Sequence, residues 1–170
     1  MSLTPSSRNT QDSRIPLLVL AALVIVLDRA SKIWIVHHIN PGYAINVVPG
    51  VFRLTHVLNT GAAFSLFADS ASPVLLRNSL IGFSILAVII VLAMIWRTGR
   101  TLSLTGIALA LILGGAIGNL YDRLRFGHVV DFLEVHIVHY HWPDFNIADS
   151  CIVIGACLLL LEIFRPQGGN

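Results

Sequence analysis

Two aspartates in apolar sequence are the residues of this 170-residue chain best suited to chemistry. Asp131 stands between Val130 and Phe132, and Asp149 follows the largely apolar segment 145–148. Two carboxyl groups held together at low dielectric constant cannot both ionise easily, so one pKa rises and the pair can share a proton. The ionised partner can activate water while the protonated partner polarises a carbonyl, as in aspartic proteases. In the alternative interpretation, Asp149 merely caps a helix.

Further ionisable residues stand near the outer ends of apolar segments. Asp28 and Lys32 are four positions apart, so on a helix they share a face and can form an ion pair. Asn119, Asp122 and Arg123 also share one helical face. Charged groups inside a membrane are costly and commonly mark functional sites. Ion pairing without a catalytic task, including an Asp122–Arg123 pair, is the alternative for both groups.

The histidines raise a competing hypothesis of metal binding. His136, His139 and His141 lie close together, but no His-Glu-x-x-His motif accompanies them. A metal site needs three or four convergent ligands, so interfacial polar residues are the favoured interpretation and no metal is expected. The stretch 136–144 receives no role. No Gly-x-Ser-x-Gly sequence indicates a serine hydrolase.

Membrane helices must position these residues. Apolar residues make up 55% of the chain and charged residues only 12%, about half the charge of a soluble domain. A helix needs about 20 apolar residues to cross a hydrocarbon core of about 30 Å. Four such segments are predicted, near 15–36, 78–96, 101–121 and 146–164. Within the third, Gly114 and Gly118 form a small-xxx-small pair that favours close helix packing, and Gly115 is assigned to the same face.

Four spans place both termini on one side of the membrane. The short connection near Arg97 and Arg100 lies on that side, together with Arg8, Arg14 and Arg165. Basic residues in short flanks favour the cytoplasm, so both termini are predicted to be cytoplasmic. The net charge of +2 and the absence of a Lys/Arg run argue against nucleic-acid binding.

The outer segments should carry the remaining structure. Pro49-Gly50 suits a type II turn between two short strands near 43–48 and 51–58. Residues 1–14 are predicted to be a disordered cytoplasmic tail, 15–165 one membrane domain, and 166–170 a second tail. Cys151 and Cys157 would lie about 9 Å apart along a helix, too far for a disulfide.

Five sequence blocks resemble the bacterial lipoprotein signal peptidases, the type II signal peptidases. The blocks are 28–32 (DRASK), 59–65 (NTGAAFS), 114–123 (GGAIGNLYDR), 129–132 (VVDF) and 145–150 (FNIADS). They occur in the family's order, and the resemblance covers about residues 15–165. Arg29 is one departure, because relatives often have glutamine there. The resemblance implies a membrane all-α fold with four transmembrane helices, a small outer β-cradle and an interfacial helix within 37–73.

Residue by residue, the resemblance implies that Asp131 and Asp149 are the catalytic dyad. The implied substrate-binding or supporting positions are Asp28, Lys32, Asn59, Gly61, Asn119, Asp122, Arg123 and Asn146.

The resemblance also implies a substrate. It would be a prolipoprotein in the bacterial inner membrane, cut just before a cysteine that carries a diacylglyceryl group, without any cofactor. The cyclic peptide antibiotic globomycin would bind the same site, which would lie near the extracytoplasmic surface. The alternative function is a small proton-coupled transporter, since intramembrane acids also mark proton pathways. Transporters commonly place such acids at the midplane between repeated halves, and no repeat is visible here.

Overall fold

The computed structural model describes residues 12–61, 73–138 and 140–165. Over these ranges the chain forms four α-helices and four β-strands. The helices are α1 (Arg14–His38), α2 (Pro73–Thr98), α3 (Leu104–Phe126) and α4 (Ile147–Ile163), and the strands are β1 (Ala44–Val48), β2 (Phe52–Asn59), β3 (Val129–Ile137) and β4 (Tyr140–His141). Each of the four predicted apolar segments therefore corresponds to one helix, with differences of up to a few residues at the ends, and the predicted tails lie largely outside the described residues.

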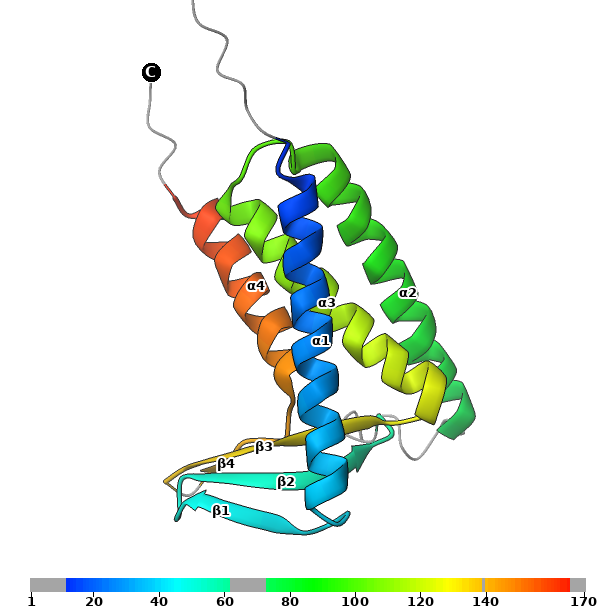
Figure 1. Cartoon of the computed structure of the whole chain (residues 1–170), viewed down its shortest axis with the longest axis vertical. Coiled ribbons are helices and arrows are strands. Elements are labelled where there is room, and N and C mark those ends of the chain that lie inside the picture. Colours follow the sequence, from blue (N-terminus) through cyan, green and yellow to red (C-terminus); the bar gives the residue numbers. More distant parts are fainter. Residues whose placement is uncertain (1–11, 62–72, 139, 166–170) are drawn as a thin grey trace, which may run out of the picture.

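The helices run alongside one another, and the sheet lies across one end of the bundle (Figure 1). Helix α3 packs against each of the other three helices, most extensively against α4. The start of α1, the α2–α3 connection and the end of α4 all lie at the end opposite the sheet (Figure 1). Polar residues near the sheet end of the helices can therefore converge with residues carried by the strands.

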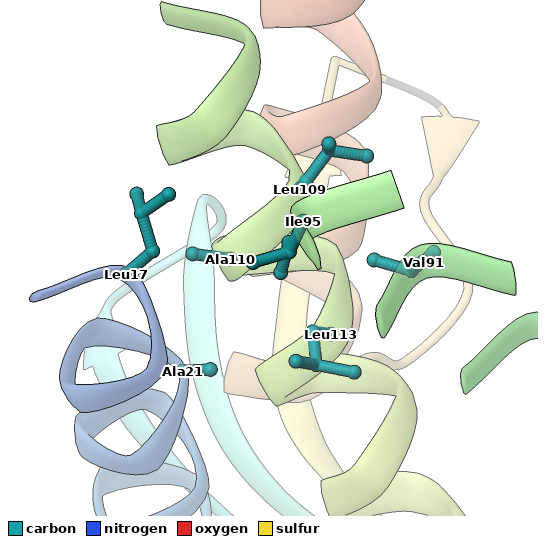
Figure 2. Packing of buried hydrophobic residues seen from close by; sticks show 7 residues of the cluster. All are labelled: Leu17, Ala21, Val91, Ile95, Leu109, Ala110 and Leu113. Atoms are coloured by element: carbon teal, nitrogen blue, oxygen red, sulfur yellow. The ribbon is translucent and has the colours of Figure 1, made fainter. Parts of the chain in front are cut away.

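An apolar cluster holds α1, α2 and α3 together at the end away from the sheet (Figure 2). Its buried members are Leu17, Ala21, Val91, Ile95, Leu109, Ala110 and Leu113. A small-residue α3 surface allows the backbones to approach closely: a Cβ on Gly114 would lie 2.7 Å from the carbonyl oxygen of Ala21 in α1. The assignment of Gly115 to the same face was wrong, because Gly115 faces α4 and a Cβ there would collide with the carbonyl oxygen of Ala148.

Two helices, Val74–Thr98 and Leu104–Phe126, are long and apolar enough to cross a membrane by length and composition. Helix α1 is 25 residues long but carries Asp28, Arg29 and Lys32 in its second half. Helix α4 is only 17 residues long. Both still expose large apolar side chains along their outer surfaces, among them Val19, Leu23, Val26, Val153, Ile154 and Leu161.

The predicted hairpin is confirmed within a residue or two. Strands β1 and β2 pair in antiparallel fashion, and the amide of Val51 donates to the carbonyl of Val48 across the turn (3.0 Å). Gly50 adopts the positive φ of 75° that this turn needs. The predicted interfacial helix falls partly on residues 62–72, outside the described residues.

The other half of the sheet was not predicted. Strand β3 pairs with β2 and with β4, giving the antiparallel order β1-β2-β3-β4. Val130 and Phe132 of β3 pack against Ile35 and Ile39 at the end of α1, which fixes the sheet to the helices. Asp131 lies within this strand and so takes its position from the sheet.

Candidate active site

Asp131 is a buried carboxylate on β3 that accepts two amide hydrogen bonds. Only 2% of the residue is exposed. Asn59 Nδ2 donates to one carboxylate oxygen (2.8 Å), and Asn146 Nδ2 donates to the other (2.7 Å). Burial raises the pKa of Asp131 to about 6, and the charge of Asp149 also raises it, whereas the hydrogen bonds from Asn59 and Asn146 oppose the rise.

Asp149 lies in the first turn of α4 and is half-buried. Asn119 Nδ2, from α3, donates to Asp149 Oδ1 at 2.7 Å. Asp149 also forms a capping box with Asn146, in which each side chain accepts the other residue's backbone N–H. The helix-capping interpretation of Asp149 is therefore correct in part, and the cap places its carboxylate at a defined point at the start of α4.

Asn146 contacts both carboxylates. Its side-chain amide donates to Asp131 Oδ1, and its backbone amide donates to Asp149 Oδ2 at 3.3 Å. Its own Oδ1 accepts the backbone N–H of Asp149 at 2.9 Å, which fixes the orientation of the amide group. The side chain is fully buried. One asparagine therefore adjoins both aspartates, although they are carried by a strand and a helix.

Gly61 fixes the second amide donor. Its backbone N–H donates to Asn59 Oδ1 at 2.8 Å, so the NH₂ group of Asn59 points toward Asp131. Gly61 has a φ of 98°, a conformation that favours glycine. The predicted site residues Asn59 and Gly61 thus act together through a local turn at the end of β2.

A buried ionic cluster lies directly behind the two aspartates. Lys32 Nζ contacts Asp28 Oδ2 at 2.8 Å and Asp122 Oδ2 at 2.7 Å, and it donates to Asn119 Oδ1 at 3.0 Å. Asp28 Oδ1 in turn accepts the backbone N–H of Ala148 in α4 at 3.0 Å. The predicted Asp28–Lys32 pair is confirmed, and the cluster joins α1 and α3 to the start of α4.

Arg123 and Asp122 do not pair in the way considered from sequence. The ion pairs of Asp122 in the described part of the chain are with Lys32 and Arg29, both from α1. Arg123 instead makes a long hydrogen bond of 3.4 Å from its guanidinium to the carbonyl oxygen of Asn119, one turn earlier in α3. The structure brings the other predicted site residues into one hydrogen-bonded network, and Arg123 adjoins it.

Arg29 was noted in the sequence only as a departure from the family pattern, and no contact with the site was predicted for it. Its guanidinium binds Asp122 at 2.9 Å and lies 4.9 Å from the centre of the Phe126 ring. It thereby shields one side of the buried cluster. Its charge beside Asp28 in an apolar segment was the available signal, because a second intramembrane cation needs an acidic partner.

An apolar cavity of about 360 Å³ lies near this network, between the end of α1, β2 and β3. Its lining includes Val36, Leu58 and Val130 together with Arg29 and Lys32. Asp131 and Asp149 are not among the lining residues. Val130 and Asp131 point to opposite faces of β3, so the strand separates this cavity from the aspartate pair.

A second polar group lies on the sheet. It consists of Glu134, His136 and His141, whose possible metal-ligand atoms all lie within 4.8 Å of one another. Within the described ranges, this is the one cluster of three or more His, Cys, Asp or Glu side chains that are close enough to share a metal ion. Glu134 is buried, and Arg53 donates to it from β2, which lowers the pKa of its carboxyl group. His139 lies outside the described residues.

The site combines two carboxylates that share an asparagine neighbour, one of them buried with a raised pKa. Such a pair can activate a water molecule and supply a proton, which is the chemistry of peptide hydrolysis by two aspartates. Amide donors and an ionic cluster hold the carboxylates in place.

Comparisons with known proteins agree on one family. Residues 20–165 match the family described as "Signal peptidase (SPase) II". A lipoprotein signal peptidase of Solibacter usitatus is 43% identical over 148 residues, which cover 86% of this chain and 89% of that protein. Its counterpart in Pseudomonas fluorescens strain Pf0-1 is 44% identical over 157 residues, covering 91% of this chain and 90% of that protein.

Solved structures give the same result for the fold. A bacterial membrane enzyme determined at 1.9 Å resolution superposes with a TM-score of 0.82 at 25% identity, covering 95% of this chain and all of that one. A second, at 2.3 Å, gives a TM-score of 0.76 and covers 91% of this chain and 94% of that one. The family match covers residues 20–165, and the relatives are 42–44% identical over most of their length. The chain therefore belongs to the signal peptidase II family, the lipoprotein signal peptidases.

Proposed function

We propose that this membrane protease removes signal peptides from diacylglyceryl-modified prolipoproteins, cutting just before the lipidated cysteine, with Asp131 and Asp149 as its catalytic dyad. The observation that carries the proposal is the contact of Asn146 with both carboxylates. Family membership supports the reaction class, and the geometry supports the choice of these two acids from the chain's nine.

The hydrogen bonds favour a division of labour between the two acids. Both oxygens of Asp131 accept short amide hydrogen bonds, an arrangement that suits the ionised form. Asp149 Oδ1 accepts one short hydrogen bond from Asn119, whereas its Oδ2 accepts only a longer one of 3.3 Å from the backbone N–H of Asn146, so Oδ2 is the less tightly bonded of the two oxygens. We assign Asp131 as the base and Asp149 as the acid.

In the proposed reaction Asp131 takes a proton from water as the water oxygen bonds to the scissile carbonyl carbon. Asp149 gives its proton to the carbonyl oxygen, forming a neutral tetrahedral intermediate. When the C–N bond breaks, Asp131 returns its proton to the nitrogen of the leaving cysteine, and Asp149 recovers a proton from the hydroxyl that becomes the new carboxyl group. Both aspartates thus regain their starting forms, as general acid–base catalysis requires.

The remaining network residues are proposed to position the dyad. Asn59 and Asn119 each donate an amide hydrogen bond to one carboxylate. Gly61 orients Asn59 by donating its backbone N–H to the Asn59 side chain. Lys32 takes no direct part in the proposed reaction and positions Asn119 by donating a hydrogen bond to its side-chain oxygen. The further supporting residues are Asp28, Asp122, Arg123 and Asn146.

We further propose that all four helices cross the bacterial inner membrane, with both termini in the cytoplasm and the sheet at the extracytoplasmic surface. The apolar outer surfaces of α1 and α4 support this, since such surfaces are stable in lipid. At about 1.5 Å per residue, α1 is about 37 Å long and α4 about 25 Å. A substrate's signal helix lying in the bilayer would then present its scissile bond at the depth of the sheet, where the dyad lies.

The transporter alternative has no support from the comparisons, in which the relatives are named as lipoprotein signal peptidases. Asp131 lies on β3 and Asp149 in the first turn of α4, so the proposed dyad lies at the sheet end rather than around the middle of the bundle. Globomycin is proposed to inhibit this enzyme by occupying the same site.

A gel-shift cleavage assay tests the proposal. Purified protein in lipid or detergent is mixed with a diacylglyceryl-modified prolipoprotein, and wild type is compared with Asp131→Asn and Asp149→Asn. Both variants should lose cleavage by at least about a thousandfold, because triad-like and dyad residues typically contribute several orders of magnitude. Asp144→Asn is the matched control, since this acid contacts Thr55 and lies outside the network. Near-normal cleavage by either dyad variant would reject the assignment.

A further inference from the structure

The cluster of Glu134, His136 and His141 lies on the β3–β4 hairpin and has no part in the proposed peptidase reaction. Glu134 and His136 are two positions apart on β3, so their side chains point to the same face of the strand. His136 and His141 are direct partners across β3 and β4, and their rings stack with centroids 4.7 Å apart. Backbone pairing therefore sets the positions of all three groups.

The two imidazole rings converge on the carboxylate of Glu134. His136 Nε2 lies 3.1 Å from Glu134 Oε1, and His141 Nε2 contacts the same oxygen. All three ligand atoms lie within 4.8 Å of one another. A zinc ion binds imidazole nitrogen and carboxylate oxygen at about 2.0–2.2 Å, so tetrahedral ligands lie roughly 3.3–3.6 Å apart. Small side-chain rotations about the present positions would provide that spacing.

One nitrogen in the cluster lacks a satisfactory protein partner. His136 Nε2 is buried, and its one close polar neighbour among the described contacts is Glu134 Oε1 at 3.1 Å, with which it does not form a hydrogen bond of normal geometry. Buried polar atoms are normally satisfied, and an unsatisfied one often indicates an ion or water. A metal ion between the imidazole and the carboxylate would satisfy both.

Arg53 does not block such an ion. It lies opposite Glu134 on β2 and donates to both carboxylate oxygens, with its Nη2 at 2.5 Å from Oε1. A carboxylate has about four acceptor positions, two on each oxygen, so Oε1 can bind a metal through its second lone pair while Arg53 keeps its hydrogen bonds to both oxygens. Metal-binding carboxylates are commonly held by hydrogen bonds of this kind.

We propose that Glu134, His136 and His141 bind one divalent transition-metal ion of the zinc class. Two imidazoles and a carboxylate favour Zn²⁺, Ni²⁺ or Cu²⁺ over Mg²⁺ or Ca²⁺, which prefer oxygen ligands. Three protein ligands leave a further coordination position for water. Glu134 and Asp131 are three positions apart and point to opposite faces of β3, so this site is separate from the aspartate dyad. The ion would join β4 to β3.

Metal binding to the full-length protein tests the proposal. The protein is purified in detergent without a polyhistidine tag, stripped of metal with a chelator, and titrated with Zn²⁺ by calorimetry and with Co²⁺ by visible absorption. Wild type should bind about one equivalent and show the absorption bands of nitrogen- and oxygen-ligated Co²⁺. His136→Ala and His141→Ala should each bind at least about 100-fold more weakly, because loss of a supporting group alone costs 10–100-fold.

The matched control is His38→Gln. His38 is an exposed histidine at the end of α1, and its contacts in the described part of the chain are with Trp34. It should bind the metal as wild type does. Zn²⁺ should raise the unfolding temperature of wild type and of this control, but not that of His141→Ala. Failure of wild type to bind a stoichiometric ion, or unchanged affinity in both cluster variants, would show that the three residues form only a hydrogen-bonded group around Arg53.

Discussion

The amide groups around Asp131 determine how readily its carboxyl group ionises. Burial raises the pKa of Asp131 to about 6, and the hydrogen bond from Asn59 holds it below the value that burial alone would give. If ionised Asp131 is the base, kcat/KM should fall as the pH drops through about 6, because protonation removes the base. Asn59→Ala should move this acid limb upward by about one pH unit, since a hydrogen bond to a charged group contributes about 1.5–3 kcal/mol.

The measurement is the pH dependence of kcat/KM for wild type and Asn59→Ala between about pH 5 and 8. A purely structural role for Asn59 would lower kcat/KM equally at every pH and leave the position of the limb unchanged. A limb that moves to lower pH in the variant would contradict the assignment of Asp131 as the ionised partner.

Lys32 compensates two buried carboxylates at once. It contacts Asp28 and Asp122, and all three side chains are at most 1% exposed. Lys32→Met should destabilise the protein by about 3–5 kcal/mol, because removing one partner leaves buried charge uncompensated. Adding Asp28→Asn should restore much of the loss, since the asparagine oxygen can still accept the backbone N–H of Ala148. Unfolding in mixed micelles titrated with SDS measures all four proteins of this double-mutant cycle, and strictly additive effects would contradict the coupling.

Residue spacing could predict only the part of this cluster that lies within one helix. Asp28 and Lys32 are four positions apart, so their pairing follows from helical geometry alone. The contact between Arg29 and Asp122 joins residues 93 positions apart and depends on how α1 and α3 are rotated toward each other. Periodicity within one helix does not contain that information, so Arg123 was considered as the partner of Asp122 instead.

At the scale of elements, the helices and the first hairpin were predictable, but β3 was not. Helices α2 and α3 are nearly uncharged apolar runs, and Pro49-Gly50 marks the hairpin turn. Strand β3 is buried along residues 129–132, and apolar and polar residues alternate only over 133–137, so the strand shows no regular alternation from end to end. Its structure comes from pairing with β2. The two strands are far apart in the sequence: the contacting residues Asn59 and Asp131 are separated by more than 70 positions. Asp131 could therefore be chosen for its chemistry without knowledge of what holds it.

The contact between α3 and α4 sets the position of Asp149 relative to the rest of the site. Gly115 lies where a Cβ would collide with the carbonyl oxygen of Ala148 and approach Ile152 Cγ1 to 2.8 Å. Gly115→Ala should therefore separate the two helices, lower stability by about 1–3 kcal/mol, and reduce cleavage at least about tenfold. The same assay and SDS unfolding provide the measurements.

Gly82 supplies the matched control for that substitution. It lies on α2, where a Cβ would meet nothing within 4 Å. Gly82→Ala should leave cleavage unchanged and stabilise the helix by up to about 1 kcal/mol, because alanine favours helix more than glycine does. Equal effects of the two substitutions would mean that close packing at Gly115 does not control the site.

On the scale of the whole molecule, exposed apolar surface and buried charged residues occupy different parts of the bundle. Helices α1, α2 and α4 expose apolar side chains along their length, whereas α3 is mostly covered by them, and the buried charged residues lie in the second half of α1, near the end of α3 and on β3. These surfaces suit the proposed orientation, in which the bundle crosses the bilayer and the sheet lies at one membrane surface. The four helices themselves were predictable, because four apolar segments stand out in the sequence. Which helix contacts which, and through which glycines, needed the fold.

The direction in which the bundle stands is the remaining prediction at this scale. Arg14, Arg97, Arg100 and Arg165 flank helix ends opposite the sheet, and basic flanks favour the cytoplasm. With Cys151 and Cys157 replaced by alanine, a membrane-impermeant maleimide should label Val51→Cys, in the β1–β2 turn, in intact spheroplasts. Thr101→Cys, in the α2–α3 connection, should be labelled only after permeabilisation. Labelling of Thr101→Cys from outside would place the sheet in the cytoplasm, where the dyad could not meet a substrate whose cleavage site has crossed the membrane.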